Sequence, residues 1–233
     1  MQVFVTSDLH LGSRHADGEL FLRFLDGLPP EATLVLNGDV VDRRQRGLSA
    51  AHRAVIDRLR EEALRREVTW VIGNHDERYR LDDPGRIRFE TSYRVGQRLF
   101  VVHGSDFIRL LPHHKIFILV FRSLHDLRVR LGGDAVHVAY YAKRFPVLYN
   151  VFRRRVARNA VSYARQHGYA AICCGHTHYA EDTMMDGVRY LNTGAWTERP
   201  VYCLRVTDAD MRLERVEPAD GTAVSRKCTS TLE

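Results

Sequence analysis

The sequence predicts a single mixed α/β domain with two sheets, and three observations lead to this fold class. Over about the first hundred residues, short apolar stretches alternate with stretches whose apolar residues recur at helical spacing. Later in the chain, the pattern changes to pairs of short strands around tight turns. A chain of 233 residues can bury a sizeable core without dividing. We therefore expect one domain at 1–217, followed by a polar, mobile tail at 218–233.

The expected elements follow from local patterns. Buried strands are predicted at 3–5, 34–36, 70–72, 100–102 and 170–173, where the residues are almost all apolar. Helices are predicted at 19–28 and 49–66, because apolar residues there return to one face. Hairpins are predicted from three strand pairs, 87–94 with 99–103, 183–185 with 188–192, and 201–206 with 211–216. Asp186-Gly187 is the clearest hairpin turn.

Polar residues follow each of the five buried strands directly. The candidate ligands are Asp8, His10, Asp39, Asn74, His103, His176 and His178. Because the carboxyl ends of parallel strands meet at one edge of a sheet, we expect these side chains to converge. Any one of them alone is more often a turn residue or an ordinary core or surface histidine. Five such clusters in this order predict a metal site.

The donor types indicate which metals fit. Carboxylate and amide oxygens combined with imidazole nitrogens suit borderline divalent ions, with Mn favoured and Fe, Co or Zn as alternatives. A structural zinc site is not expected, because no thiolate belongs to the set. Two ions about 3.5 to 4 Å apart need a shared carboxylate and activate a water molecule as nucleophile. Asp39 is the best candidate for the bridge, because its strand would be central.

Cysteine usage and hydropathy bear on the compartment. Cys173 and Cys174 are neighbours in a predicted strand, so their side chains point to opposite faces and cannot pair. Free thiols are typical of a reducing compartment, and we expect a cytoplasmic protein. A signal peptide is not expected, because its cleavage would remove Asp8. The longest apolar run, at 116–121, is far shorter than the ~20 residues of a membrane span.

Residues 109–158 break the alternating pattern and form an insertion between two predicted strands. The insertion contains eleven Arg and Lys residues but only two acidic residues, Asp126 and Asp134. Three interpretations remain open. The insertion packs on the body with solvated arginines, or it is a cap that binds an acyl chain and anionic phosphates, or it contacts nucleic acid. The last is less favoured, because the aromatic residues cluster with aliphatic ones. In the second case, Arg153, Arg154 and Arg155 are the candidate substrate contacts.

The order of these motifs resembles the calcineurin-like metallophosphoesterases. The insertion after His103-Gly104 and the late stretch at 190–198 make the chain similar to the UDP-2,3-diacylglucosamine pyrophosphatase family of lipid A biosynthesis. This resemblance covers about the first 207 residues and implies a four-layer α/β/β/α sandwich with a helical cap. It assigns the ligands Asp8, His10, Asp39 and His178 to one ion. It assigns Asp39, Asn74, His103 and His176 to the other.

Two positions depart from the best-known branch of that family. That branch carries Arg where this chain has His75, whereas a second branch keeps the sequence Asn-His-Asp-Glu found at 74–77. The resemblance implies that His75 polarises a phosphoryl oxygen or protonates the leaving group. Asp42 and Asp76 are either orienting partners for such imidazoles or ordinary turn residues. Ser105 separates Gly104 from Asp106, so a substrate contact at Asp106 is not carried over.

The resemblance implies hydrolysis of a nucleoside-diphospho-lipid to UMP and a lipid-sugar 1-phosphate. In-line attack on one phosphorus would occur at the metal site, with the acyl chains under the cap. The basic helices would hold the enzyme on the anionic inner face of the cell membrane as a peripheral protein. A soluble nucleotide or nucleic-acid phosphodiesterase is the alternative. A non-catalytic scaffold is less favoured, because the candidate ligand set is intact.

Overall fold

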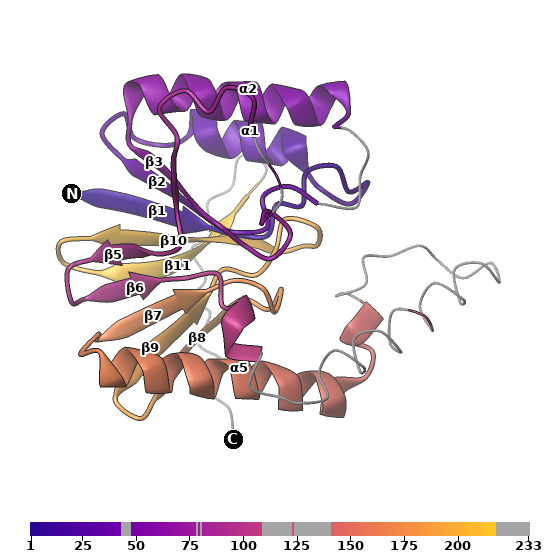
Figure 1. Cartoon of the computed structure of the whole chain (residues 1–233). Coiled ribbons are helices and arrows are strands. Elements are labelled where there is room, and N and C mark those ends of the chain that lie inside the picture. Colours follow the sequence, from indigo (N-terminus) through magenta and orange to yellow (C-terminus); the bar gives the residue numbers. More distant parts are fainter. Residues whose placement is uncertain (43–47, 78, 80, 109–122, 124–140, 218–233) are drawn as a thin grey trace.

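The computed structural model describes residues 1–42, 48–77, 79, 81–108, 123 and 141–217. Two sheets lie face to face between two outer layers of helices (Figure 1). Helices α1 (Gly18–Asp26) and α2 (Ala50–Arg65) cover the first sheet, and α5 (Pro146–Gln166) covers the second. The predicted four-layer α/β/β/α sandwich is therefore confirmed.

The first sheet has the strand order β11-β10-β1-β2-β3-β4. Its strands are β1 (Gln2–Thr6), β2 (Thr33–Asn37), β3 (Val68–Val71), β4 (Arg88–Glu90), β10 (Val201–Thr207) and β11 (Met211–Val216). Strands β1 to β4 run parallel, while β10 pairs antiparallel with both β1 and β11. Since β1, β2 and β3 are parallel, they all deliver the following loop to the same edge.

The second sheet has the order β5-β6-β7-β9-β8. Its strands are β5 (Tyr93–Val95), β6 (Leu99–Val101), β7 (Ala171–Cys174), β8 (Glu181–Met185) and β9 (Val188–Asn192). Strands β6, β7 and β9 run parallel, and the β8–β9 hairpin turns at the predicted Asp186-Gly187. A short 3₁₀ helix, η1 (Ser105–Ile108), follows the loop after β6.

Period-two alternation divides the strand residues between the layers. In β1, Val3 and Val5 face the second sheet, whereas Phe4 faces the helices. The core beneath α1 and α2 includes Leu59 and Trp70, both fully buried. Beneath α5, the small residues of the helix face let it lie close to β7 and β9; they are Ala157, Ala160, Val161 and Ala164. The strands are thus fixed on both faces, which holds their ends in place.

Local chemistry sets the helix starts close to the predicted ones. Asp17 caps α1 by accepting a hydrogen bond from the backbone N of Leu20 at 2.9 Å. Ser49 does the same for α2, accepting from the backbone N of His52. Helix α5 begins with Pro146 in its first turn, where the missing N–H costs nothing.

One predicted element is wrong. The strand expected at 87–94 is two strands, β4 and β5, which belong to different sheets. Thr91 and Ser92 carry the chain between them. All three residues of β4 are exposed, and β5 buries only Val95, so the sequence carries no apolar pattern that marks where the chain changes sheet.

The insertion expected at about 109–158 also differs in its end. Helix α5 continues without a break past 158 to Gln166, and its second half packs on the second sheet. The apolar run at 116–121 and the tail at 218–233 lie outside the described residues. In the part of the chain that the structure describes, no helix has the length and apolar composition to cross a membrane. Cys173, Cys174 and Cys203 are buried free thiols, as expected.

Candidate metal centre

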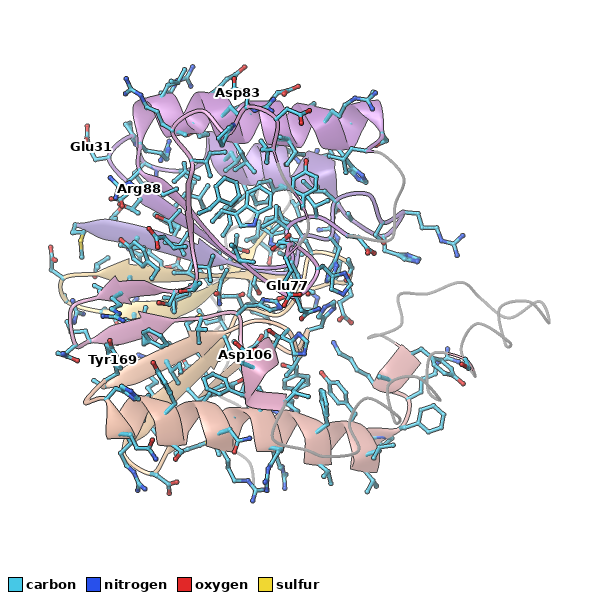
Figure 2. All side chains as sticks on the ribbon, viewed as in Figure 1. Glu31, Glu77, Asp83, Arg88, Asp106 and Tyr169 are labelled. Carbon is cyan, nitrogen blue, oxygen red and sulfur yellow. The ribbon has the colours of Figure 1, made fainter. Side chains whose placement is uncertain are left out.

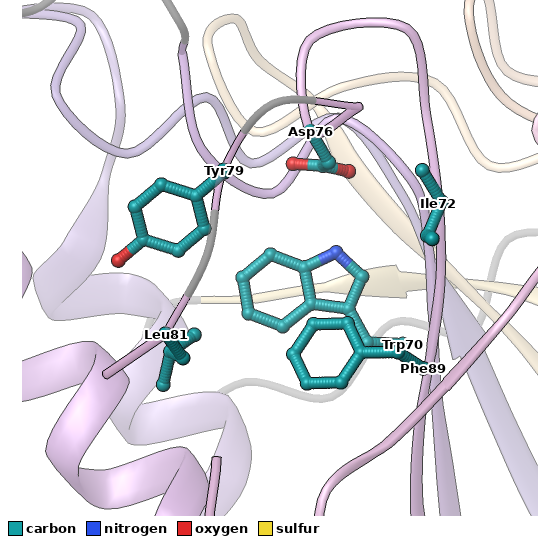
Figure 3. A pocket seen from close by; sticks show the side chains of 6 residues that line it. All are labelled: Trp70, Ile72, Asp76, Tyr79, Leu81 and Phe89. Carbon is teal, nitrogen blue, oxygen red and sulfur yellow. The ribbon is translucent and has the colours of Figure 1, made fainter. Parts of the chain in front are cut away.

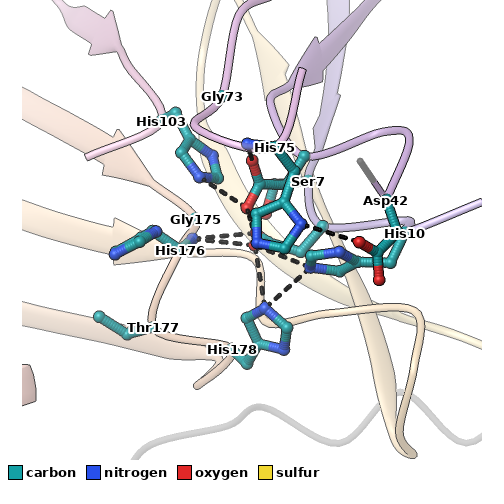
Figure 4. A network of polar contacts seen from close by, with 12 residues as sticks. Ser7, His10, Asp42, Gly73, His75, His103, Gly175, His176, Thr177 and His178 are labelled. Atoms are coloured by element: carbon teal, nitrogen blue, oxygen red, sulfur yellow. Dashed lines mark hydrogen bonds and ion pairs between the residues drawn. The ribbon is translucent and has the colours of Figure 1, made fainter. Parts of the chain in front are cut away.

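The four histidines predicted as ligands, His10, His103, His176 and His178, lie together at the ends of strands from both sheets (Figure 4). Asp8 and Asp39 follow β1 and β2 of the first sheet. His103 and His176 follow β6 and β7 of the second sheet. The sequence predicted convergence along the edge of one sheet, but the structure draws the ligands from both. The site therefore spans the interface between the two sheets.

The first group of converging side chains is Asp8, His10 and His178, whose potential ligand atoms all lie within 4.8 Å of one another. His178 Nε2 is 3.2 Å from Asp8 Oδ1 and 3.1 Å from His10 Nε2. All three residues are buried. This is the trio, without the bridging carboxylate, that was expected for one ion.

The second group is Asp39, His103 and His176, and a third consists of His10, Asp39 and His75. Asp39 belongs to both, which is the arrangement expected of a carboxylate that two ions share. His103 Nε2 lies 3.2 Å from Asp39 Oδ2. The structure thus brings together three of the four residues predicted for the second ion, namely Asp39, His103 and His176.

The donor atoms fit a cation. His103 Nδ1 lies 2.9 Å from the carbonyl oxygen of Asn37, which only accepts, so Nδ1 carries a proton. In the neutral ring, Nε2 then turns a lone pair towards the carboxylate of Asp39. Two lone pairs 3.2 Å apart require a positive charge between them, either a proton or a metal ion. Asn74 Oδ1 is likewise buried without a hydrogen-bond partner among the described residues.

The pKa values express the same electrostatics. Burial opposes the charged forms of Asp39 and His103, but each offsets this cost for the other. The imidazoles of His103, His75 and His10 hold the pKa of Asp39 below its ordinary value. The Asp39 carboxylate raises the pKa of His103 to about 10. Burial lowers the pKa of His176 to about 3, which keeps its ring neutral, as a metal ligand must be.

The backbone conformation of the ligands is unusual, and no local pattern in the sequence predicted it. Six non-glycine residues in the described ranges have positive φ, and five of them are predicted ligands: Asp8, His10, Asp39, His176 and His178, at 51° to 64°. This left-handed region costs about 1–3 kcal/mol per residue unless the surroundings hold it. Such strain gathered at one edge is typical of a functional site.

Two glycines are required by close approach. A Cβ at Gly73 would lie 2.3 Å from Asp39 Oδ1, and a Cβ at Gly175 would lie 2.3 Å from Asp8 Oδ2. No side chain fits at these distances. The two loops can therefore lie against the carboxylates only because these positions are glycine.

His75 and Asp42 form a pair beside the ligands (Figure 4). Asp42 Oδ1 is 3.2 Å from His75 Nδ1, and the backbone N–H of His75 donates to Asp39 Oδ1 at 2.7 Å. The His75 side chain is 15% exposed, and its Nε2 lies 4.0 Å from Asp39 Oδ2. Asp42 thus orients His75, which leaves Nε2 for a group at the metal centre.

For Asp76, the sequence left open whether it orients an imidazole or is an ordinary turn residue, and the structure shows it bound to backbone N–H groups. Within the described residues, its carboxylate accepts hydrogen bonds from the backbone N–H groups of Val41 at 3.0 Å, Gly73 at 3.1 Å and Val40 at 3.4 Å. It ties the loop after β2 to the loop after β3. Burial, with the nearby Asp39, raises the pKa of Asp76.

An apolar pocket of about 180 Å³ lies behind Asp76 (Figure 3). Its lining residues are Trp70, Ile72, Tyr79, Leu81 and Phe89, with Asp76 as the charged member. The Trp70 ring stacks on Phe89 with a centroid distance of 5.2 Å. The residues that line this pocket pack against the loop after β3 on the side of the first sheet that α1 and α2 cover.

The three arginines predicted to contact the substrate differ in their exposure to solvent. Arg154 and Arg155 are exposed on α5, as expected. Arg153 is 4% exposed, pairs with Glu181 at 2.5 Å and lies over the Tyr179 ring at 4.3 Å, so its prediction as a substrate contact is wrong. A run of three basic residues looks solvated in the sequence, but on a helix consecutive positions face different directions.

Sequence reasoning missed several polar residues around the ligands. Asn192 donates to the carbonyl oxygen of Gly175 at 2.7 Å, and Tyr149 and Lys143 donate to the carbonyl oxygens of Thr177 and His178. In the sequence, the only signals are that Asn192 ends a predicted strand and that Lys143 and Tyr149 lie near the arginine run. Glu77 and Asp106 are exposed beside the loops, on the edge that carries the ligands (Figure 2).

Comparisons with known proteins agree with this geometry. A family model described as calcineurin-like phosphoesterase matches residues 1–180. A search of curated proteins found no match.

Solved structures to which this chain is similar include an archaeal phosphodiesterase, with a TM-score of 0.48 at 16% identity over 92% of this chain and 99% of that one. YfcE, a phosphoesterase from E. coli, has a TM-score of 0.47 at 17% identity over 91% and 92%. Vps29 from Chaetomium thermophilum has a TM-score of 0.48 at 12% identity over 92% and 96%. Because these sequence identities are low, the three solved structures do not indicate which reaction this chain catalyses.

Proposed function

Because the chain belongs to the calcineurin-like phosphoesterase family and is a metal-dependent hydrolase, we propose that it cleaves the pyrophosphate of a nucleoside-diphospho-lipid such as UDP-2,3-diacylglucosamine. The products are UMP and a lipid-sugar 1-phosphate. The enzyme works with two divalent ions, Mn first among the candidates, at the cytoplasmic face of an anionic membrane.

The observation that carries this proposal is the outer face of α5. Three apolar residues, Val147, Leu148 and Val151, are exposed there, Val147 at 79% and Val151 at 61%. Exposed arginines continue the same face at helical spacing: Arg154, Arg155 and Arg158. An apolar end beside a basic end suits acyl chains and anionic head groups together.

The helix that carries this face also contacts the metal centre, but from its opposite side. Tyr149, two residues after Val147 and therefore about 200° around the helix, donates to the carbonyl oxygen of Thr177, between His176 and His178. A lipid held on the exposed face would have to extend past the N-terminal end of α5 to bring its phosphates to the ligands. A soluble nucleotide diesterase needs the metal centre but has no use for exposed apolar residues on this helix.

The residues of the site have defined parts in the hydrolysis. The converging Asp and His side chains would hold two ions, which when bound would supply an activated water molecule and offset charge on the phosphoryl oxygens. The oxygen of water adds to one phosphorus in line with the bridging oxygen, whose bond to that phosphorus breaks. In its protonated form, His75 keeps Nδ1–H on Asp42 and offers Nε2–H to a phosphoryl or leaving oxygen. The carboxylates of Asp39 and Asp8 would bind the ions and keep their positive charge beside the phosphorus.

The test compares two substrates in one variant. Replacing Arg154, Arg155 and Arg158 by Glu should weaken binding to anionic vesicles and slow hydrolysis of the acylated substrate. Each contact of Arg with an anionic surface contributes about 1 kcal/mol, so the loss should exceed tenfold and shrink at high salt. Hydrolysis of bis(p-nitrophenyl) phosphate should stay as in the original protein, because the metal centre is untouched.

A matched control changes the same net charge elsewhere. Arg53, Arg65 and Arg86 are exposed and remote from α5, and their replacement by Glu should affect neither substrate. Equal rates on the acylated substrate for both triple variants would contradict the proposal and favour a soluble nucleotide or nucleic-acid substrate.

A further inference from the structure

The loop that carries His176 and His178 has a strained backbone. Both residues have positive φ, 64° and 55°, a conformation that persists only where the surroundings fix it. On the side of the second sheet, Asn192 Nδ2 holds the loop by donating to the carbonyl oxygen of Gly175 at 2.7 Å and to Thr177 Oγ1 at 3.1 Å. The other side of the loop faces α5.

Two side chains, one at the start of α5 and one in the turn before it, donate hydrogen bonds to the backbone on either side of the His178 Cα. Tyr149 Oη donates to the carbonyl oxygen of Thr177 at 2.7 Å. Lys143 Nζ donates to the carbonyl oxygen of His178 at 2.5 Å and to Glu198 Oε1 at 2.6 Å. The first bond fixes the peptide plane before the His178 Cα, and the second fixes the plane after it. Together they fix both backbone angles of this ligand.

Arg153 holds the next residues of the loop. Its guanidinium pairs with Glu181 at 2.5 Å and lies 4.3 Å above the Tyr179 ring. Both ends of the Arg153–Glu181 pair are nearly out of reach of water, with exposed fractions of 4% and 7%. A buried pair of this kind fixes a geometry better than it stabilises a fold.

We propose that Lys143, Tyr149 and Arg153 are positioning residues of the metal centre, which hold His178 in ligand geometry through its backbone. Helix α5 is then part of the metal site, besides carrying the outer surface discussed above. This inference does not depend on the lipid substrate, because it concerns only the loop and its ions.

The sharpest variant is Tyr149→Phe, which removes one hydroxyl and keeps the ring. Groups that orient a metal ligand change metal affinity by about 10–100-fold. We expect Co²⁺ titrated into the metal-free protein to bind at least tenfold more weakly, with an altered visible absorption spectrum. The thermal unfolding of the metal-free variant should match that of the original protein. Lys143→Met should act in the same direction, since it frees the other peptide plane.

The matched control is Tyr163→Phe. Tyr163 lies on the same helix and packs against Phe100 with a centroid distance of 5.3 Å, and its hydroxyl makes no hydrogen bond to any residue that the structure describes. The same chemical change should therefore leave Co²⁺ binding unaltered. For Arg153, the Lys variant keeps a charge opposite Glu181 and should retain more Co²⁺ affinity than the Met variant.

Activity separates positioning from folding. With bis(p-nitrophenyl) phosphate, Tyr149→Phe should lose activity at limiting metal and regain most of it at saturating metal, with KM unchanged. Unchanged Co²⁺ affinity in both Tyr149→Phe and Lys143→Met would overturn the proposal. So would a loss of thermal stability in the metal-free variants together with a loss of activity that added metal does not restore.

Discussion

Individual residues define this site through contacts that are partly visible in the sequence. Asp8 and His178 could be predicted as ligands, because polar residues that follow buried strands in this order converge at a sheet edge. The roles of Asp42 and Asp76 could not be separated, since both are acids in strand-end loops. Only the fold shows that Asp42 contacts the His75 ring, whereas Asp76 binds backbone N–H groups.

At the residue scale, we predict that His75→Ala lowers kcat by about a hundredfold and leaves metal binding intact, the usual effect of losing one acid or transition-state donor. Asp42→Asn should lower kcat less, because the ring stays but loses its orienting carboxylate. Rates with bis(p-nitrophenyl) phosphate and metal analysis of the purified variants test both. Loss of bound metal in step with activity would show that His75 is itself a ligand.

The pKa of His103 gives a prediction for the metal-free protein. Its folded value of about 10 lies above its unfolded value of about 6.5, so the proton stabilises the folded state. This contribution is fully present below pH 6.5 and is lost as the pH rises through 10. The melting temperature of the metal-free protein should fall between pH 7 and 10. His103→Gln should remove most of that fall, and a fall of the same size in this variant would count against the assignment.

The positions of helices and strands along the chain were easier to predict than the sheet that each strand joins. Helix α2 and the β8–β9 hairpin lie close to their expected places, because a helical face and an Asp-Gly turn are local signals. The split of the strand expected at 87–94 depends on which sheet each half joins. That choice is made by Phe89 against Trp70 and by Val95 in the core between the sheets, which are contacts distant in sequence.

At the element scale, α2 offers a matched pair of leucines. Leu59 is fully buried, whereas Leu64, five residues further on, is 66% exposed. Leu59→Ala should lower the free energy of unfolding by about 2–5 kcal/mol, because it leaves a cavity beneath the helix. Leu64→Ala should change it by less than about 0.5 kcal/mol. Urea unfolding of both variants measures the difference, and equal effects would mean that α2 packs through another face.

The whole molecule consists of two sheets whose strand ends share one site. The sequence predicted the ligands but placed them along a single sheet, because the order of strands within each sheet depends on contacts that no local pattern records. Asp8 and Asp39 belong to one sheet, and His103 and His176 to the other. Any cation that these ligands share also joins the two halves of the fold.

We therefore predict that metal removal destabilises the entire domain. A ligand that binds only the folded state at a hundred times its Kd contributes about 2.7 kcal/mol. The melting temperature should rise when Mn²⁺ is added to metal-free protein and should fall again with a chelator. Asp39→Ala removes the carboxylate common to two of the ligand groups, so it should abolish activity and reduce bound metal to one ion or none.

The same variant should also lose most of the stabilisation by Mn²⁺, because the remaining ligands no longer hold an ion between the sheets. Surface sites cannot produce this result, since Asp39 is buried at the junction and has no part in them. Two tightly bound ions in Asp39→Ala, or an undiminished rise of its melting temperature with Mn²⁺, would show that the metals bind elsewhere.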